Sequence, residues 1–340
     1  TGEDNTAVGF GALEFNTIGT DNVAVGHIAL QDNTTGVQNC AIGNQCMRDC
    51  ITGRYNTAVG SYALALCTNG DYNVAMGYGA AFGNTTANDN VALGRYTLYT
   101  NTTGIRNVAI GTYALRLGTT DDFYYNTAVG YKALEDTTRF HNTAVGYEAL
   151  TACTTGFGNS ALGYWAGKGN LGGYYNTYIG WEAGDNITTG YNNTVLGYDA
   201  KASSATVNNE FTLGNSSVAT LRCQQTSITA LSDRRDKTNI VDLDQGIDFI
   251  SALKPVSFEW KCRDGSLEGV KEFGFIAQDL ADTEDNFGVT EYLRLVLKNN
   301  PDKLEARPMQ TYPILIKAVQ QLIEKVKSLE VEVANLKLAT

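Results

Sequence analysis

The first part of the chain repeats one short pattern of polar, apolar and glycine positions. The pattern is Asn-x-Ala-aliphatic-Gly, and it begins at Asn5, Asn22, Asn39, Asn56, Asn73, Asn90 and Asn107 in steps of 17 residues. It continues at Asn126, Asn142, Asn159, Asn176 and Asn193, with steps of 19 and 16 residues on either side of Asn126, and a worn copy follows at 210–214. Tyr178 and Val195 replace the alanine in the last two full copies. So regular a period predicts stacked repeats.

Each repeat is typical of one coil of a β-solenoid. A short β segment ends at the glycine, an apolar pair such as Ala29-Leu30 follows, and Asn-Thr-Thr-Gly supplies a turn. We expect the leading Asn to stack as an amide ladder. We also expect the aliphatic residue before the glycine to form an interior core row: Val8, Val25, Ile42, Val59, Met76, Leu93 and Ile110. A 17-residue coil encloses little volume, so oligomerisation would supply the missing core.

The composition changes near residue 231. All four prolines follow it, and the charged residues number 10 basic and 17 acidic before it but 15 and 19 in the shorter remainder. We therefore expect a mainly β protein with four parts: a shaft over 1–214, a linker over 215–231, a small α+β domain over 232–311, and a terminal helix over 312–340.

The terminal helix carries a heptad seam from about Tyr312 to Lys337. Its apolar residues alternate steps of four and three: Leu315, Val319, Leu322, Val326, Leu329, Val333 and Leu336. Lys325 and Glu330 fall at positions suited to an interchain ion pair. Val at a with Leu at d slightly favours two strands, so the coiled coil alone does not fix the number of chains.

Two resemblances give these parts a context. Asn107-Val-Ala-Ile-Gly111 resembles the repeat of trimeric autotransporter adhesin heads, although the 17-residue period is longer than is usual there. That resemblance implies a trimeric β-solenoid, or β-roll. Ser232-Asp-Arg-Arg-Asp-Lys-Thr-Asn-Ile240 resembles the start of the intramolecular chaperone, or auto-processing, domain of phage endosialidases, tail spikes and neck appendages. Three later segments follow in the same order as in that domain: the strand Pro255–Trp260, the stretch Phe273–Gln278 and the terminal helix.

The second resemblance implies a chaperone that helps the upstream trimer fold and then cuts itself off with a Ser–Lys dyad. Carried over by position, the nucleophile is Ser232, the base is Lys237, and the scissile bond is Leu231–Ser232. No external substrate is implied, so the chain would be a single-turnover serine autopeptidase. Taken alone, Ser-Asp-x-x-x-Lys is typical of a helix N-cap followed by a solvated lysine.

The chemistry of a Ser–Lys dyad fits this composition. A serine hydroxyl needs a base, and the only histidines, His27 and His141, lie far upstream, which disfavours a Ser-His-Asp triad. A lysine serves if burial or cationic neighbours keep it neutral, and Arg234 and Arg235 are close in sequence. Attack on the preceding carbonyl proceeds either as an N→O acyl shift or as direct hydrolysis, and both stay open.

The remaining candidate residues carry weaker signals. Asp233 and Asn239 are candidate supporting residues, and Gln278 is read as a structural hydrogen-bonding residue. Aromatic residues recur after the repeat glycine, at Phe10, Tyr78, Tyr131, Tyr147, Tyr164, Trp181 and Tyr198. They indicate either a stacked solenoid wall or a sugar-binding row. Asp121-Asp122 and Glu3-Asp4 lack the spacing of a glycosidase pair.

Several function classes are disfavoured. A net charge of -11 argues against binding nucleic acid or an anionic membrane, and the longest apolar runs are too short to insert in a bilayer. Seven cysteines with no CxxC pair argue against a disulfide framework or a zinc site. Cys50, Cys67 and Cys153 occupy the repeat position held elsewhere by Asn33, Asn84 and Asn101. We expect neither a metal nor a cofactor.

The two resemblances together imply a homotrimeric virion tail fibre or spike that is assembled in the host cytoplasm and attaches to a host glycan or protein receptor. One alternative is a cell-surface trimeric adhesin head, which would lack the Ser–Lys junction. The other is a polysaccharide-degrading tail spike, which would require a carboxylate cluster on the shaft.

Overall fold

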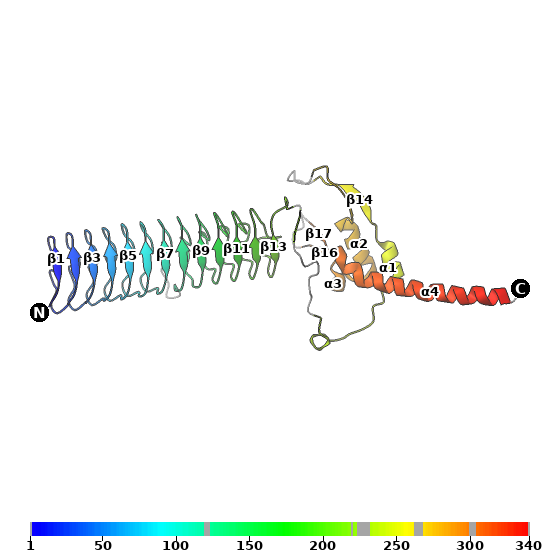
Figure 1. Cartoon of the computed structure of the whole chain (residues 1–340), viewed down its shortest axis with the longest axis horizontal. Coiled ribbons are helices and arrows are strands. Elements are labelled where there is room, and N and C mark those ends of the chain that lie inside the picture. Colours follow the sequence, from blue (N-terminus) through cyan, green and yellow to red (C-terminus); the bar gives the residue numbers. More distant parts are fainter. Residues whose placement is uncertain are drawn as a thin grey trace. The chain divides into compact units, whose positions relative to one another are not determined.

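The computed structural model describes residues 2–118, 123–218, 220–222, 232–261, 268–298 and 304–338. The chain divides into two compact units, Thr1–Asn215 and Ser216–Thr340. Figure 1 shows the first unit as a row of similar coils that follow one another in chain order, from β1 to β13. We call this unit the solenoid and the second one the C-terminal unit.

The solenoid is built on one parallel sheet. Its 13 strands are hydrogen-bonded in chain order, and each has three residues. The strands are β1 (Thr6–Val8), β2 (Val23–Val25), β3 (Cys40–Ile42), β4 (Thr57–Val59), β5 (Val74–Met76), β6 (Val91–Leu93), β7 (Val108–Ile110), β8 (Thr127–Val129), β9 (Thr143–Val145), β10 (Ser160–Leu162), β11 (Thr177–Ile179), β12 (Thr194–Leu196) and β13 (Phe211–Leu213). The predicted β-solenoid of 17-residue repeats is confirmed, and the worn copy forms its last strand.

The irregular steps leave the sheet register intact. Thr127 pairs with Val108 across the 19-residue step and with Thr143 across the 16-residue step, so equivalent strand positions still face each other. The differences in length therefore lie outside the paired strand residues.

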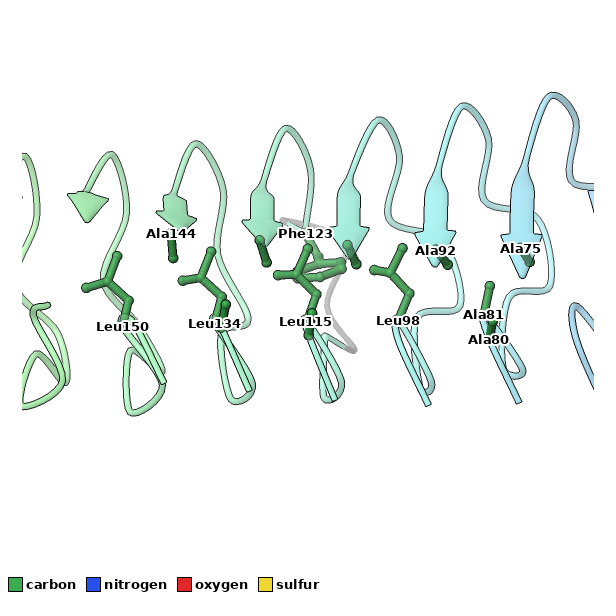
Figure 2. Packing of buried hydrophobic residues seen from close by; sticks show 14 of the residues in the cluster. Ala75, Ala80, Ala81, Ala92, Leu98, Leu115, Phe123, Leu134, Ala144 and Leu150 are labelled. Carbon is green, nitrogen blue, oxygen red and sulfur yellow. The ribbon is translucent and has the colours of Figure 1, made fainter. Parts of the chain in front are cut away.

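The core of the solenoid is made of the central strand residue and the apolar pair after the glycine. Ala75, Ala92 and Ala144 point inward from their strands, toward Leu98 and Leu134 of the opposite wall (Figure 2). The inward central residue is alanine in most coils, and those alanines are completely or almost completely buried, except Ala7 in the first coil. One narrow core thus runs through all the coils.

The predicted core row of aliphatic residues before the glycine is wrong. Met76 is 46% exposed and Leu162 is 52% exposed, whereas the alanine beside each is buried. Successive strand residues point to opposite faces, so an inward alanine forces both of its neighbours outward. In most coils the interior is filled from the opposite wall by side chains such as Leu98 and Leu134, which leaves space for an alanine methyl group at this position.

The predicted asparagine ladder is confirmed, with the main chain as its chief partner. Oδ1 of Asn90 accepts a hydrogen bond from the backbone N–H of Asn107 at 2.9 Å, and its Nδ2 donates to the carbonyl of Gly104 at 2.9 Å. The same arrangement recurs coil after coil. Each buried side chain therefore satisfies two main-chain groups that the strands leave unpaired.

The C-terminal unit is a small α+β fold. Its elements are η1 (Arg234–Asp236), α1 (Ile247–Ala252), β14 (Val256–Glu259), β15 (Lys271–Gly274), α2 (Ala277–Phe287), α3 (Thr290–Leu293), β16 (Val296–Leu297), β17 (Glu305–Ala306), η2 (Pro308–Thr311) and α4 (Tyr312–Leu338). Strands β14 and β15 form one antiparallel hairpin, and β16 and β17 form another. The core consists of Phe249, Leu280, Val289, Leu295, Val296 and Ile314.

The terminal helix α4 has an attached face and a free seam. Ile314 and Ala318 are buried, and Oε1 of Gln321 accepts a hydrogen bond from the backbone N–H of Ile247 at 2.8 Å. The seven residues of the predicted seam lie elsewhere on the helix and are 45–62% exposed. Within the described part of the chain, no helix is both long and apolar enough to cross a membrane.

Candidate active site

The segment from Ser232 to Lys237 folds on itself through one short turn. Asp233 caps the 3₁₀ helix η1, because its carboxylate accepts a hydrogen bond from the backbone N–H of Arg235 at 2.8 Å. The backbone N–H of Lys237 donates to the carbonyl of Arg234, which closes the turn. The motif Ser-Asp-x-x-x-Lys, taken alone, is typical of a helix N-cap. The structure gives that role to Asp233, and the Ser232 hydroxyl remains available for another contact.

The turn brings the predicted nucleophile and base together. Nζ of Lys237 donates a hydrogen bond to Oγ of Ser232 at 2.5 Å. Direct contact between hydroxyl and amine is the geometry that proton transfer from serine to lysine requires. Local geometry alone makes this contact, since both side chains are exposed and the turn closes within six residues.

The two predicted cationic neighbours differ in their surroundings. The Arg235 guanidinium is bound to the Asp233 carboxylate, with 2.6 Å between Nη2 and Oδ2, and this holds the pKa of Asp233 below its ordinary value. The charge of Arg235 is therefore compensated by Asp233. Arg234 contributes its carbonyl to the turn, and its side chain is exposed.

The other predicted site residues lie around this turn or away from it. Asn239 adopts a left-handed backbone with φ of 53°, and its Oδ1 accepts a hydrogen bond from the Thr238 hydroxyl at 3.5 Å. Gln278 is exposed in the first turn of α2. No hydrogen bond among the described residues joins it to Ser232 or Lys237. Leu231, the residue before the expected scissile bond, lies outside the described residues.

One acidic residue that the sequence did not single out is buried in the core of the C-terminal unit. Glu284 is 1% exposed, and its Oε1 accepts a hydrogen bond from the backbone N–H of Leu295. Its Oε2 has no hydrogen-bond partner among the described residues. The sequence carries little signal for this, because Glu284 stands in an acidic, polar stretch that is typical of an exposed helix face.

Comparison with known families places this turn at the start of a recognised domain. Residues 232–288 match the family described as chaperone of endosialidase. No curated protein and no solved structure matches the chain. The match begins at the candidate nucleophile, Ser232, and runs through α2. With the solenoid of 17-residue repeats before it, the chaperone-of-endosialidase domain fits a phage tail spike or fibre with a C-terminal intramolecular chaperone, and its family is one of autoproteolytic chaperones.

The aromatic rows of the solenoid favour the wall interpretation. The rings of Tyr131, Tyr147, Tyr164 and Trp181 stack face to face, with neighbouring centroids 4.2–5.1 Å apart and interplanar angles of 10–18°. Sugar rings bind the open faces of aromatic side chains, and in this row neighbouring rings cover those faces. The described residues contain no group of three or more His, Cys, Asp or Glu that could hold a metal ion.

Proposed function

We propose that this chain is the C-terminal part of a homotrimeric phage tail fibre that attaches the virion to its host. On this proposal, the chaperone domain assembles the fibre and then removes itself by cutting the Leu231–Ser232 bond. The observation that carries the cleavage is the 2.5 Å contact between Lys237 Nζ and Ser232 Oγ at the first residue of the chaperone match.

In the acyl-shift route, one proton leaves the Ser232 hydroxyl and one proton is delivered to the Ser232 nitrogen. In its neutral form, the Lys237 amine would take the proton of the Ser232 hydroxyl as Oγ bonds to the carbonyl carbon of Leu231. The carbon–nitrogen bond then breaks, the Ser232 nitrogen receives a proton, and Leu231 is left as an ester on Oγ. Water hydrolyses this ester to a Leu231 carboxylate and the Ser232 hydroxyl, and Ser232 keeps the free amine that the acyl shift produced. In the direct alternative, lysine activates water for attack on the same carbonyl.

Two features of the C-terminal unit support the proposed trimer. The family implies self-association of three chains. The seam of α4 offers each copy an uncovered apolar face, with Lys325 and Glu330 exposed beside it. The receptor would be a glycan or a protein on the host surface.

Mass spectrometry of the purified chain tests the cleavage. We expect fragments 1–231 and 232–340 from the wild type, and uncut chain from Ser232→Ala and Lys237→Ala. Ser227→Ala, which removes another serine hydroxyl shortly upstream of the proposed nucleophile, is the control and should be cut as in the wild type. Cutting of Ser232→Ala at the same bond would refute the dyad.

Hydroxylamine distinguishes the two routes, because it captures an ester. Added during maturation, it should convert the Leu231 end of the shaft to a hydroxamate if the acyl shift operates. A free carboxylate as the sole product would indicate direct hydrolysis.

A further inference from the structure

The outward side chains of the 13 strands form a long uncharged strip along the solenoid. We define the strip as the first and third residues of β1–β13. The third residues are all aliphatic: Val8, Val25, Ile42, Val59, Met76, Leu93, Ile110, Val129, Val145, Leu162, Ile179, Leu196 and Leu213. The first residues are Thr6, Val23, Cys40, Thr57, Val74, Val91, Val108, Thr127, Thr143, Ser160, Thr177, Thr194 and Phe211.

Charge is excluded from the strip although the rest of the solenoid surface carries many charges. None of its 26 positions is Asp, Glu, Lys or Arg. Elsewhere on the coils, charged residues form ion pairs such as Lys168–Glu148 at 2.8 Å and Arg116–Glu135 at 3.1 Å. If the strip faced only water, charged residues would be tolerated on it as they are on the rest of each coil.

The area of the strip is at the upper end of the apolar patches that monomers expose and approaches the area of a stable interface. Thirteen strands spaced about 4.8 Å apart, each about 10 Å long, present a flat area on the order of 600 Å². The largest apolar patch on a typical monomer is about 300–600 Å², and a stable interface buries about 800 Å² on each partner. Met76, Leu162 and Leu213 are 46–52% exposed, so much of this apolar surface is uncovered in a single copy.

We propose that the strip is the face on which three copies of this solenoid pack, parallel and in register, around a common axis. This rests on the proposed trimer and identifies the surface that makes it. A partner that contacts every strand must repeat with the same axial spacing, and a second copy of the chain has that spacing by construction. The missing charge also lets identical faces approach without repulsion.

The difference between the two columns of the strip favours three copies over two. The third strand residue is aliphatic in every strand, whereas the first is Thr, Ser or Cys in eight of the thirteen. Two sheets packed face to face would bury both columns equally. Three sheets around an axis bring one column of each copy to the centre and leave the other toward the edge of the contact. The aliphatic column is then the central one, with three identical side chains in each layer.

A matched pair of double substitutions tests the strip in the full chain. Leu162→Glu with Ile179→Glu places carboxylates on the strip, at residues 52% and 44% exposed. Leu171→Glu with Ile51→Glu places the same charge on turn residues 47% and 40% exposed, outside the sheet. In sedimentation of the released 1–231 fragment, we expect the wild type and the turn variant to be trimers and the strip variant to be a monomer. A strip variant that remains trimeric overturns the proposal.

A cross-link provides a positive signal that does not depend on disrupting the fold. In a background with Cys40→Ser, Cys223→Ser and Cys262→Ser, Val145→Cys should form a disulfide between copies when copper–phenanthroline removes two electrons and two protons from a pair of thiols. Because three copies share each layer, we expect at most about two thirds of the chains to become covalent dimers. Leu171→Cys, the turn control, should give none. Absence of a Val145→Cys cross-link, or conversion of nearly all chains to dimer, overturns the three-fold strip.

These outcomes are separate from those of the proposed function. If the strip fails both tests while fragments 1–231 and 232–340 still appear, the strip is wrong and the self-cleaving fibre stands. If the wild type yields no cleavage, the proposed dyad fails whatever the cross-link shows.

Discussion

The two units of this chain hold themselves together in opposite ways. In the solenoid, each coil repeats the contacts of the coil before it, including the buried asparagine that bonds two main-chain groups. In the C-terminal unit, the contacts are not repeated: Phe249 packs edge-to-face on Phe287, and Gln321 of α4 bonds the start of α1. Because its contacts are not repeated, the C-terminal unit can form all of them in only one arrangement of the chain.

This difference explains why one unit would need the other. A strand of the solenoid paired one repeat out of place would meet almost the same partners, so the energy gap between correct and slipped registers is small. A parallel sheet built coil by coil also exposes strand edges while it grows. An aperiodic domain at one end can bring three chains together in a single alignment, and the periodic shaft can extend from it.

Removal of the C-terminal unit should have the largest effect. Residues 1–231 expressed without 232–340 should aggregate, because nothing then aligns the chains before the coils form. Solubility and sedimentation of the product measure this. The control is the same fragment released from full-length protein by cleavage, which should stay folded because its finished contacts no longer need the chaperone. A soluble, heat-resistant trimer from the truncated gene would contradict the chaperone role.

Gly94→Val should disrupt the solenoid next most severely. Gly94 has φ of 133°, and a Cβ there would lie 2.9 Å from the carbonyl carbon of Gly111 in the next coil. Left-handed strain and backbone overlap together should cost on the order of 3–5 kcal/mol per chain. Gly172→Val is the matched control, because its φ lies outside the left-handed region and a Cβ would meet only the Thr155 hydroxyl. Thermal unfolding of the released shaft should show a large loss for Gly94→Val alone.

Much of this architecture was readable in the sequence, and the failures have physical reasons. The 17-residue spacing predicted the coil and the register, because equivalent residues must face each other in a stacked repeat. The spacing of Ser232 and Lys237 predicted their contact, which a single turn makes. The inward face was misassigned because a three-residue strand gives too short an alternation to orient it. The larger Met76 was then assigned to the core, although Ala75 is the buried residue and Met76 is exposed.

The sequence analysis also missed a pair of compensating size changes in the solenoid core, in which a large residue replaces a small one and small residues replace large ones. In the coil of Tyr178, the ring stands where other coils have the alanine methyl group, and it fills the space beside Gly167 and Gly184. Most of the equivalent positions in other coils are leucines such as Leu150. The large and small replacements lie in different parts of the repeat, so only the folded coil shows that they meet.

Tyr178→Ala should therefore open a cavity and cost about 3–5 kcal/mol. Gly184→Leu alone should also destabilise, because its Cβ would lie 2.2 Å from the Tyr178 ring. Together the two substitutions restore the alanine and one leucine of the common repeat. Chemical denaturation of the four proteins should then show that the double variant loses clearly less than the two single losses combined. Additive losses would mean that the ring does not occupy the leucine space.

The smallest effect should come from returning Cys153 to the residue that other coils have at its position. The Cys153 thiol donates to the carbonyl of Gly156 at 3.5 Å, as Nδ2 of Asn101 donates to Gly104 at 3.0 Å. Cys153→Asn preserves this bond in the same pocket, so at neutral pH we expect a change within about 1 kcal/mol. Denaturant unfolding at pH 7 measures it, and a larger loss would show that the coil has adapted to sulfur.

At alkaline pH, the stabilities of the wild type and Cys153→Asn should differ. Burial raises the pKa of Cys153 from its ordinary value of 9.0 to about 12, so the fold favours the protonated thiol. The thiol's contribution to stability is then complete below pH 9 and declines above it, as the unfolded chain ionises first. Between pH 9 and 12, wild type should lose up to about 1.4 kcal/mol per pH unit relative to Cys153→Asn, because all other titrating groups are shared. Parallel stability curves across that range would show that Cys153 ionises as readily in the coil as in the unfolded chain.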